Sequence, residues 1–225
     1  MIRILDLIIS ILIIVFFIPI ILVIIFLIFL QDFRSPIYIS ERIGKNFKTF
    51  KLYKIRTMKI NNKSKSIRTT RDNDSRITKL GRVIRDYKID EVLQFINVLK
   101  NDMSIVGPRP NVLEEIKKYS KKEMQLIKIK PGVTDLASIT LVKMSKLFSK
   151  KLNSDVNKEY FKKIKPLKNK LALIWVKKPS IQLYFIILIL TPISIFFHQF
   201  ANREIEKLTK EYNPKLSRRI KDLIC

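Results

Sequence analysis

The longest run without a charged residue, Leu7 to Leu30, constrains this chain more than any other feature. A helix rises about 1.5 Å per residue, so the run exceeds the roughly 30 Å hydrocarbon core of a bilayer and has to lie in a membrane. It is too long for the apolar part of a signal peptide, and no small-residue cleavage site follows it before Arg34. The sequence therefore predicts a retained membrane helix within residues 1–34.

Two arrangements of this helix are open. A spanning helix is the physical default, and the excess of Lys and Arg after the run would then hold the rest of the chain in the cytoplasm and send Met1 outside. Pro19 instead favours a kink, because it removes one backbone hydrogen bond and clashes with the preceding turn. A kinked helix can enter and leave the membrane by the same face, as a re-entrant helix.

The charge balance narrows the choice of partner. The formal net charge of +26 indicates a polyanion: a nucleic acid, an anionic membrane leaflet or a phosphorylated substrate. Part of the excess is what an AT-rich genome produces at tolerant surface positions. The single cysteine, Cys225, cannot form an internal disulfide, which fits a reducing compartment. The sequence contains no Cys/His metal cluster, no P-loop and no dinucleotide-binding glycine motif.

The segment from Lys88 to Pro110 carries the most specific pattern. We expect a helix from about Ile89 to Lys100, with a buried stripe and an opposite polar face. The stripe comprises Ile89, Val92, Leu93, Ile96 and Leu99, and the polar face Asp90, Gln94 and Asn97. Asp90 and Glu91 then lie in the first turn, where free N–H groups favour negative charge, so they are either an acidic helix start or a functional pair.

Arg109 lies between Pro108 and Pro110. Proline fixes its own φ angle and keeps the preceding residue extended, so the guanidinium is presented by a stiff backbone. Such an arginine is either an anion ligand or half of a salt bridge in a tight loop.

Several motifs together resemble one protein family. They are Glu41-Arg42-Ile43-Gly44, Phe50 to Met58, Asp74 to Thr78 with Gly81 and Arg85, Asp90-Glu91, Gln94, Asn97 to Leu99, Asp102 to Ser104 and Val106-Gly107-Pro108-Arg109-Pro110. This combination resembles the bacterial sugar transferases, the small monotopic phosphoglycosyl transferases that load polyprenyl phosphate. The resemblance continues to about Thr191.

The resemblance implies an activity and a set of partners. It implies transfer of a sugar-1-phosphate from a nucleotide diphosphate sugar, with a UDP-sugar expected, to polyprenyl (undecaprenyl) phosphate, with release of UMP. This is the first membrane step in making exopolysaccharide, capsule, O-antigen or glycoprotein glycans. It also implies a re-entrant helix at Pro19, contact with inner-membrane lipids, a catalytic domain facing the bacterial cytoplasm, and no specific nucleic acid.

The resemblance also assigns roles to residues. Asp90 is implied as the nucleophile that forms an aspartyl-phosphosugar intermediate, and Glu91 as the ligand of Mg²⁺. The candidates for phosphate or nucleotide binding are Lys54, Arg56, Arg76, Arg85 and Arg109. Apart from Arg109, each of these cations could instead be part of a solvated basic face without a binding role. Gly107, Pro108 and Pro110 are implied as structural members of the motif.

We expect an α+β fold that is mostly helical, with a small β-hairpin and amphipathic interfacial helices. The hairpin is predicted from β-prone runs at residues 37–40 and 49–55 around Gly44. Residues 61–74 read as a polar loop, and residues 76–86 and 112–129 as helices. The segments are a membrane helix (1–34), one catalytic domain (35–180), an apolar membrane-associated helix (181–200) and a basic tail (201–225).

Two other functions remain open. A membrane-anchored relative that has lost turnover could serve as a scaffold, although the intact Asp90, Glu91 and Arg109 argue against it. A basic, membrane-tethered nucleic-acid binder fits the charge, but the chain has no helix-turn-helix, RRM-like or OB-like pattern. The sequence identifies neither the sugar nor the oligomeric state.

Overall fold

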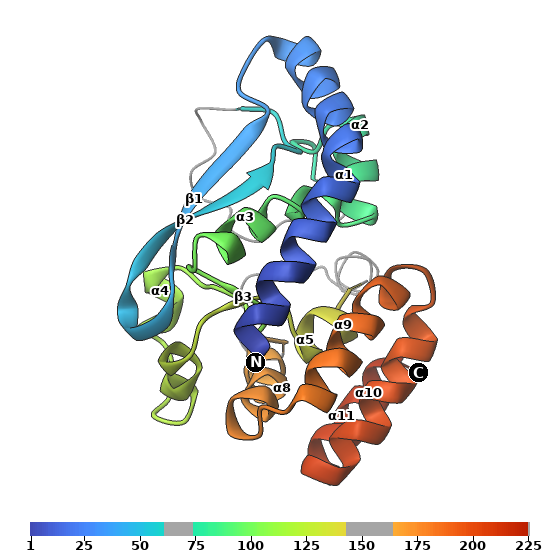
Figure 1. The fold of residues 1–225 in the computed structure, drawn as a ribbon. Helices are drawn as coiled ribbons and strands as arrows, with labels where there is room; N and C mark the ends of the chain where they lie inside the picture. Colours follow the sequence, from blue (N-terminus) through green and yellow to red (C-terminus); the bar gives the residue numbers. More distant parts are fainter. Residues whose placement is uncertain (61–73, 143–163, 225) are drawn as a thin grey trace. The chain divides into compact units, whose positions relative to one another are not determined.

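The structure is a computed structural model that describes residues 1–60, 74–142 and 164–224 (Figure 1). Except for Asp74, the polar loop predicted over residues 61–74 lies outside the described residues. The chain divides into two compact units. The first contains residues 1–59 and 76–133, and the second contains residues 60–75 and 134–225.

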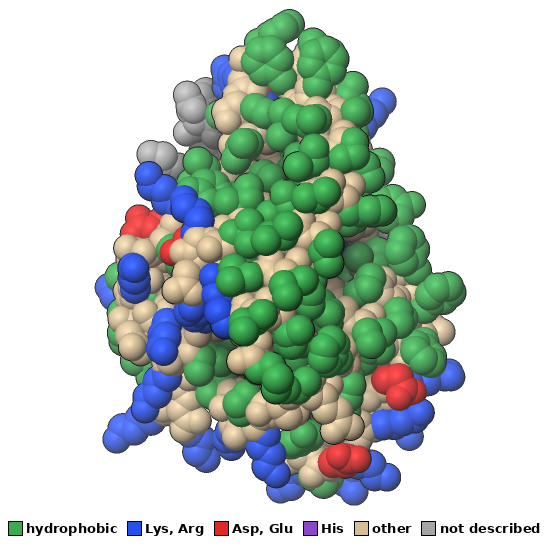
Figure 2. Space-filling view, viewed as in Figure 1, with side chains coloured by type: hydrophobic (Ala, Val, Ile, Leu, Met, Phe, Trp, Pro, Cys, Tyr) green, Lys and Arg blue, Asp and Glu red, His purple; other side chains and the backbone are tan. Residues whose placement is uncertain are grey.

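The first unit begins with α1 (Ile2–Asp32), which continues as one helix through Pro19. Among the described helices, it is the one long and apolar enough to cross a membrane. The side that faces the rest of the unit buries Ile21, Ile24 and Ile28. Large apolar side chains are exposed on the other side, and Figure 2 shows them gathered along the helix. These exposed side chains include Leu12, Val15, Phe16, Leu22, Val23 and Phe26.

The predicted β-hairpin is confirmed. Strands β1 (Ile37–Ile43) and β2 (Thr49–Ile55) pair antiparallel, from Ile37 opposite Ile55 to Ile43 opposite Thr49. A 3₁₀ turn, η1 (Lys45–Phe47), connects the two strands. Phe50 and Leu52 of β2, which are two residues apart and share a face, are both buried, so one face of the hairpin contributes to the core of the unit.

Helix α2 (Lys79–Asp86) starts at Thr78, whose hydroxyl accepts a hydrogen bond from the Gly81 backbone N–H at 2.9 Å. Gly81 is required there because an added Cβ would lie 2.1 Å from the carbonyl oxygen of Thr57. This contact brings the start of α2 against the residues that follow β2.

The prediction of one helix from Ile89 to Lys100 is wrong. The segment forms a 3₁₀ turn, η2 (Ile89–Glu91), followed by a short helix, α3 (Gln94–Leu99). Lys88, just before η2, has a left-handed backbone with φ of 58°, so the chain enters the segment through a turn.

The predicted faces of this segment are also partly wrong. Ile96 is 37% exposed, whereas Gln94 and Asn97 are buried. The reason is hydrogen bonding, because the Asn97 amide accepts from the Tyr53 N–H at 3.1 Å and donates to the Lys51 carbonyl at 2.7 Å. The polar face of α3 thus binds the backbone of β2 instead of solvent.

Two short strands follow, β3 (Ser104–Val106) and β4 (Gly132–Thr134), which form a second small sheet. The helix predicted over residues 112–129 is instead two pieces, α4 (Leu113–Ile116) and the 3₁₀ helix η3 (Glu123–Lys128). The chain breaks at Ser120, because the Glu123 carboxylate accepts hydrogen bonds from both the backbone N–H and the hydroxyl of Ser120.

The second unit is helical. It contains α5 (Leu136–Thr140), α8 (Lys165–Lys177), α9 (Ile181–Phe196), α10 (His198–Tyr212) and α11 (Pro214–Ile224). The apolar helix α9 buries Leu183, Tyr184 and Ile187 within this unit. The predicted basic tail forms two helices, α10 and α11. The expected mostly helical α+β fold is therefore confirmed, and one catalytic domain remains an expectation.

Candidate active site

The 3₁₀ turn η2 presents Asp90 and Glu91 side by side. Their side chains are only 11% and 13% exposed, so both carboxylates are largely removed from solvent. Val92 and Leu93, which follow directly, are packed in a core cluster with Ile24 and other residues of α1. The apolar packing of Val92 and Leu93 therefore holds the turn that carries the two acids.

Glu91 is bound by two cations. The Arg109 guanidinium donates to both oxygens of the Glu91 carboxylate, to Oε2 at 3.0 Å and to Oε1 through a second, shorter hydrogen bond. Lys54 donates to Oε1 at 2.8 Å. A bidentate arginine and a lysine on one carboxylate form a rigid group with one net positive charge.

Asp90 is held more loosely. The Lys54 ammonium lies 3.9 Å from Oδ2 of Asp90, at the outer limit of an ion pair. One lysine therefore lies between the two acids and bonds more closely to Glu91 than to Asp90.

Burial and charge move the two pKa values in opposite directions. Burial raises the pKa of Asp90 above its usual range, and the neighbouring Glu91 charge adds to the rise, although Lys54, Lys88 and Arg85 oppose it. Burial also acts to raise the pKa of Glu91, but the charges of Arg109 and Lys54 outweigh it and hold that pKa well below its usual range. The two cations thus favour the ionised form of Glu91, whereas burial and the Glu91 charge favour the neutral form of Asp90.

Backbone contacts on both sides hold Arg109 in position. The Pro108 carbonyl accepts a hydrogen bond from the Gly132 N–H at 3.0 Å, and the Asn111 carbonyl accepts one from the Ile43 N–H at 3.0 Å. Gly107 has to be glycine, because an added Cβ would lie 2.8 Å from the Lys130 carbonyl oxygen. The stiff presentation predicted for Arg109 has this structural basis, and Pro110 beside it is buried.

The other predicted cations lie in different places. Arg85 donates to the Thr57 hydroxyl at 2.7 Å and is near enough to affect the pKa of Asp90. Arg56 is buried and paired with Asp32 at the end of α1, with a contact of 2.6 Å. Arg76 precedes α2, where its carbonyl accepts a hydrogen bond from the Lys59 N–H at 2.8 Å. The structure thus brings Lys54, Arg85 and Arg109 to the acid pair and gives Arg56 a structural ion pair.

Two residues near the site were not predicted as site residues. The positive charge of Lys88 contributes to the electrostatic potential at both acids. Its left-handed φ is visible in the structure but not in the sequence. Arg42 is half-buried on β1, where burial lowers its pKa and the charge of Arg109 lowers it further. The position of Arg42 within a motif was its sequence signal, but its proximity to Arg109 depends on the fold.

The charges around the two acids suit a polyanionic ligand. Four cations act on the pair, namely Lys54, Arg85, Lys88 and Arg109, against two carboxylates, which leaves two positive charges in excess. Fixed cations beside a carboxylate pair can bind a diphosphate and stabilise charge during phosphoryl transfer. Together with the apolar helix α1, these features describe a chain with one helix long and apolar enough to cross a membrane and a buried carboxylate pair beside cations that could bind phosphate.

The chain belongs to the bacterial sugar transferase family, whose profile, described as Bacterial sugar transferase, matches residues 1–198. This match covers both acids, all five predicted cations and α1.

Three relatives indicate what members of the family do. The chain is 35% identical over 152 residues to a UDP-glucose:undecaprenyl-phosphate glucose-1-phosphate transferase of Escherichia coli, covering 63% of this chain and 33% of that protein. It is 33% identical to a UDP-N-acetylgalactosamine-undecaprenyl-phosphate N-acetylgalactosaminephosphotransferase of Aeromonas hydrophila, covering 60% and 32%. It is 35% identical to an undecaprenyl-phosphate galactose phosphotransferase of Salmonella typhimurium, covering 49% and 26%. The chain thus spans about a third or less of these relatives' length.

Proposed function

We propose that this protein transfers a sugar-1-phosphate from a UDP-sugar to undecaprenyl phosphate, giving undecaprenyl-diphosphate sugar and UMP for the synthesis of a surface glycan. The observation that carries the proposal is the unequal treatment of the two acids. Glu91 is fixed by Arg109 and Lys54, whereas Asp90 lies 3.9 Å from its nearest cation and keeps its oxygens available for reaction. The names of the relatives support the acceptor and the type of donor.

A carboxylate nucleophile solves a charge problem. Two like unit charges about 4 Å apart repel by roughly 4 kcal/mol at an effective dielectric near 20, so direct attack of one phosphate on another is costly. In the proposed first step, an oxygen of Asp90 attacks the sugar-linked phosphorus, and the bond from that phosphorus to the bridging oxygen breaks, so that UMP leaves. In the second step, an oxygen of undecaprenyl phosphate attacks the same phosphorus, and the bond to Asp90 breaks and restores the carboxylate.

The cations have separate tasks in this scheme. Arg109 and Lys54 favour the ionised form of Glu91, and they raise the local potential for the incoming diphosphate. Lys54 also favours the ionised form of Asp90, which is the form that can attack. Arg85 and Lys88 add to the same potential.

Glu91 is the proposed ligand of Mg²⁺, and its contacts are compatible with that role. Oε1 accepts hydrogen bonds from both Arg109 and Lys54, whereas Oε2 accepts one from Arg109 and keeps acceptor capacity. Among the described residues no group of three or more His, Cys, Asp or Glu side chains could enclose a metal, which fits an ion that takes most of its ligands from substrate phosphates and water. The ion would supply charge neutralisation on the diphosphate.

The contacts at the two ends of α1 favour a re-entrant helix. At its start, Arg3 donates to the Val98 carbonyl at 2.8 Å, and Asp6 accepts from the Ser104 hydroxyl at 2.6 Å. At its end, Asp32 pairs with Arg56. A spanning helix would separate its ends by about 30 Å of hydrocarbon, whereas here both ends bind the same unit. We therefore propose that both ends lie on one side, the cytoplasmic side of the inner membrane, where the basic residues are expected.

A test for the covalent step uses donor without acceptor. Purified protein in detergent is mixed with Mg²⁺ and a panel of UDP-sugars, and UMP release and the intact protein mass are followed. We expect a burst of about one UMP per protein and an added sugar phosphate on the peptide that contains Asp90. Asp90→Asn should show neither, while Asp86→Asn, an exposed acid on the preceding helix, should behave like wild type.

Three results would contradict the proposal. An active Asp90→Asn protein would reduce Asp90 to an acid at a turn. UMP release that requires undecaprenyl phosphate would indicate direct transfer between the substrates. Failure of every donor even with acceptor present would favour a scaffold that has lost turnover.

A further inference from the structure

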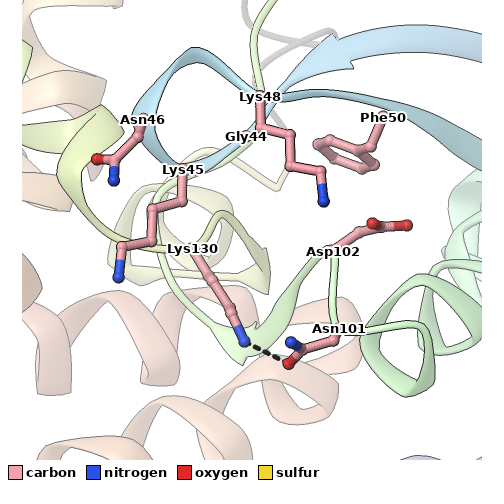
Figure 3. Close-up of a pocket in the computed structure, with 8 residues that line it drawn as sticks. All are labelled: Gly44, Lys45, Asn46, Lys48, Phe50, Asn101, Asp102 and Lys130. Carbon is pink, nitrogen blue, oxygen red and sulfur yellow. Dashed lines mark hydrogen bonds between the residues drawn. The ribbon is translucent and has the colours of Figure 1, made fainter.

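A pocket lined mainly by polar residues lies in the first unit, at the turn of the β-hairpin (Figure 3). Its volume is about 420 Å³. The residues around it come from the hairpin turn and from two loops that follow α3 and η3. They are Gly44, Lys45, Asn46, Lys48, Phe50, Asn101, Asp102 and Lys130.

The pocket is separate from the active site. Lys54, which contacts the two acids, is near one end of β2, and the pocket is at the turn before the other end. Phe50 lines the pocket and Lys54 lies four residues farther along β2, so at roughly 3.3 Å per residue the two are about 13 Å apart along the strand. None of the residues that line the pocket contacts Asp90 or Glu91 through a hydrogen bond or ion pair described above.

The pocket has an excess of positive charge. Three lysines, Lys45, Lys48 and Lys130, line it together with one carboxylate, Asp102. Asn101, which has a left-handed φ of 69°, accepts a hydrogen bond from the Lys130 ammonium (Figure 3). Partial burial lowers the pKa of Lys130, and the charges of Arg3 and Lys45 lower it further. Positive charges that repel one another around a hollow are stabilised by a bound anion.

The pocket also lies next to the start of α1. Arg3 and Asp6, in the first turns of that helix, are close enough to Lys130 to affect its pKa, in opposite directions. Arg3 and Asp6 face the unit through their hydrogen bonds, while Ile4 and Ile8 are 63% and 51% exposed on the apolar side. Figure 2 shows lysine and arginine side chains along the edge of this apolar face. Basic residues at the border of a lipid-facing surface are placed to meet phosphate headgroups.

We propose that the pocket formed by Lys45, Lys48, Asn101 and Lys130 binds the phosphate of an anionic phospholipid whose acyl chains lie against the exposed side of α1. The lysines supply charge, and the amide groups of Asn46 and Asn101 can donate hydrogen bonds to phosphate oxygens. Such a lipid fixes the depth at which the first turns of α1 sit. A free phosphate shares this chemistry but lacks the acyl chains, so the two ligands can be distinguished.

The test measures lipid retention. The full chain is purified in a neutral detergent, mixed with equal amounts of phosphatidylglycerol and phosphatidylcholine, and the bound lipids are counted by native mass spectrometry. The pocket variant is Lys45→Gln with Lys130→Gln. The matched control is Lys121→Gln with Lys122→Gln, which removes the same charge from an exposed loop of the same unit. Circular dichroism checks that each variant is folded.

We expect wild type and control to retain phosphatidylglycerol in preference to phosphatidylcholine. In the pocket variant, that preference should fall about fivefold for each lysine removed. This is the effect expected of one basic residue near an anionic lipid surface. Equal losses in the two variants, or equal retention of both lipids by wild type, would overturn the proposal. So would millimolar inorganic phosphate displacing the lipid completely, because that result would assign the pocket to a soluble anion. If the pocket variant fails to fold, Lys48→Gln alone is compared with Lys121→Gln by the same criteria.

Discussion

Removing the charge of Lys54 should make Asp90 harder to ionise. The Lys54 ammonium lies 3.9 Å from Oδ2 of Asp90. At that distance two unit charges interact by about 4 kcal/mol at an effective dielectric near 20. The Lys54 side chain is 20% exposed, so water screens part of this interaction, and Lys88 and Arg85 remain in the variant. We expect Lys54→Gln to raise the pKa of Asp90 further above its usual range, because a charge that favours the carboxylate is lost.

The direction of the pH effect follows from the proposed role of Asp90. The carboxylate attacks only when it is ionised, so activity is lost as the pH falls through its pKa. Burial and Glu91 already raise that pKa in the wild type, so the acid side of the profile should lie above that of an ordinary aspartate. In Lys54→Gln the acid side should move to still higher pH.

The assay is kcat/KM for the UDP-sugar, from UMP release, measured across pH and scaled to the maximum of each variant. Scaling separates the position of the profile from the lower rate expected when a phosphate-binding lysine is lost. Lys51→Gln is the control, because it removes the same charge from an exposed position on the same strand. The reasoning is refuted if the acid side of the Lys54→Gln profile stays within about 0.3 units of wild type, or moves to lower pH.

Three further variants test the fold and the topology. Gly132→Ala would place a Cβ 2.1 Å from the backbone nitrogen of Gly107, so it should lower the free energy of unfolding by about 3 kcal/mol or more in denaturant titration. Asn97→Ala leaves the Tyr53 N–H and the Lys51 carbonyl without partners and should cost about 2–4 kcal/mol in the same measurement. A cysteine at Ile2, in a Cys225→Ser background, should resist an impermeant thiol reagent added outside intact cells.

Each of these variants has a matched comparison. Gly44→Ala meets its nearest atom at 3.2 Å and should cost much less than Gly132→Ala. Asn101→Ala removes an exposed amide at a left-handed φ of 69° and should cost only about 1 kcal/mol, less than Asn97→Ala. A cysteine at Ser120, in an exposed loop, should be as protected from outside reagent as the cysteine at Ile2. Ready labelling at position 2 alone would establish a spanning helix, and equal stability of Gly132→Ala and Gly44→Ala would contradict the close approach of the two glycines.

Local patterns in the sequence were sufficient for some elements. The apolar run predicted α1, and the short β-prone runs on both sides of Gly44 predicted the hairpin, because both signals are local in sequence. Helix periodicity was not sufficient at residues 89–100. The left-handed turn at Lys88 and the hydrogen bonds from Asn97 to β2 decide that segment, and they depend on a strand more than 40 residues away in sequence.

The candidate site, too, could be predicted from the sequence only in part. The motif identified Asp90, Glu91 and Arg109, but it did not show that Arg109 binds Glu91 and leaves Asp90 to a single distant lysine. Lys54 and Arg56 lie two residues apart in the same motif, and both were predicted to bind phosphate or nucleotide. In the structure, Lys54 bonds to Glu91 whereas Arg56 bonds to Asp32, a difference that depends on where α1 ends.

The packing of α1 bears on the proposed transfer from a soluble donor to a lipid acceptor. Ile24 and Ile28 of α1 share a core cluster with Val92 and Leu93, the two residues directly after Glu91. The opposite side of the same helix is exposed and apolar. A helix with its side chains is about 10 Å across, so the acids lie roughly one helix diameter from the surface that α1 offers to lipid. A phosphate at the bilayer surface can reach a carboxylate at that depth, whereas a site farther from α1 would require the acceptor to leave the membrane.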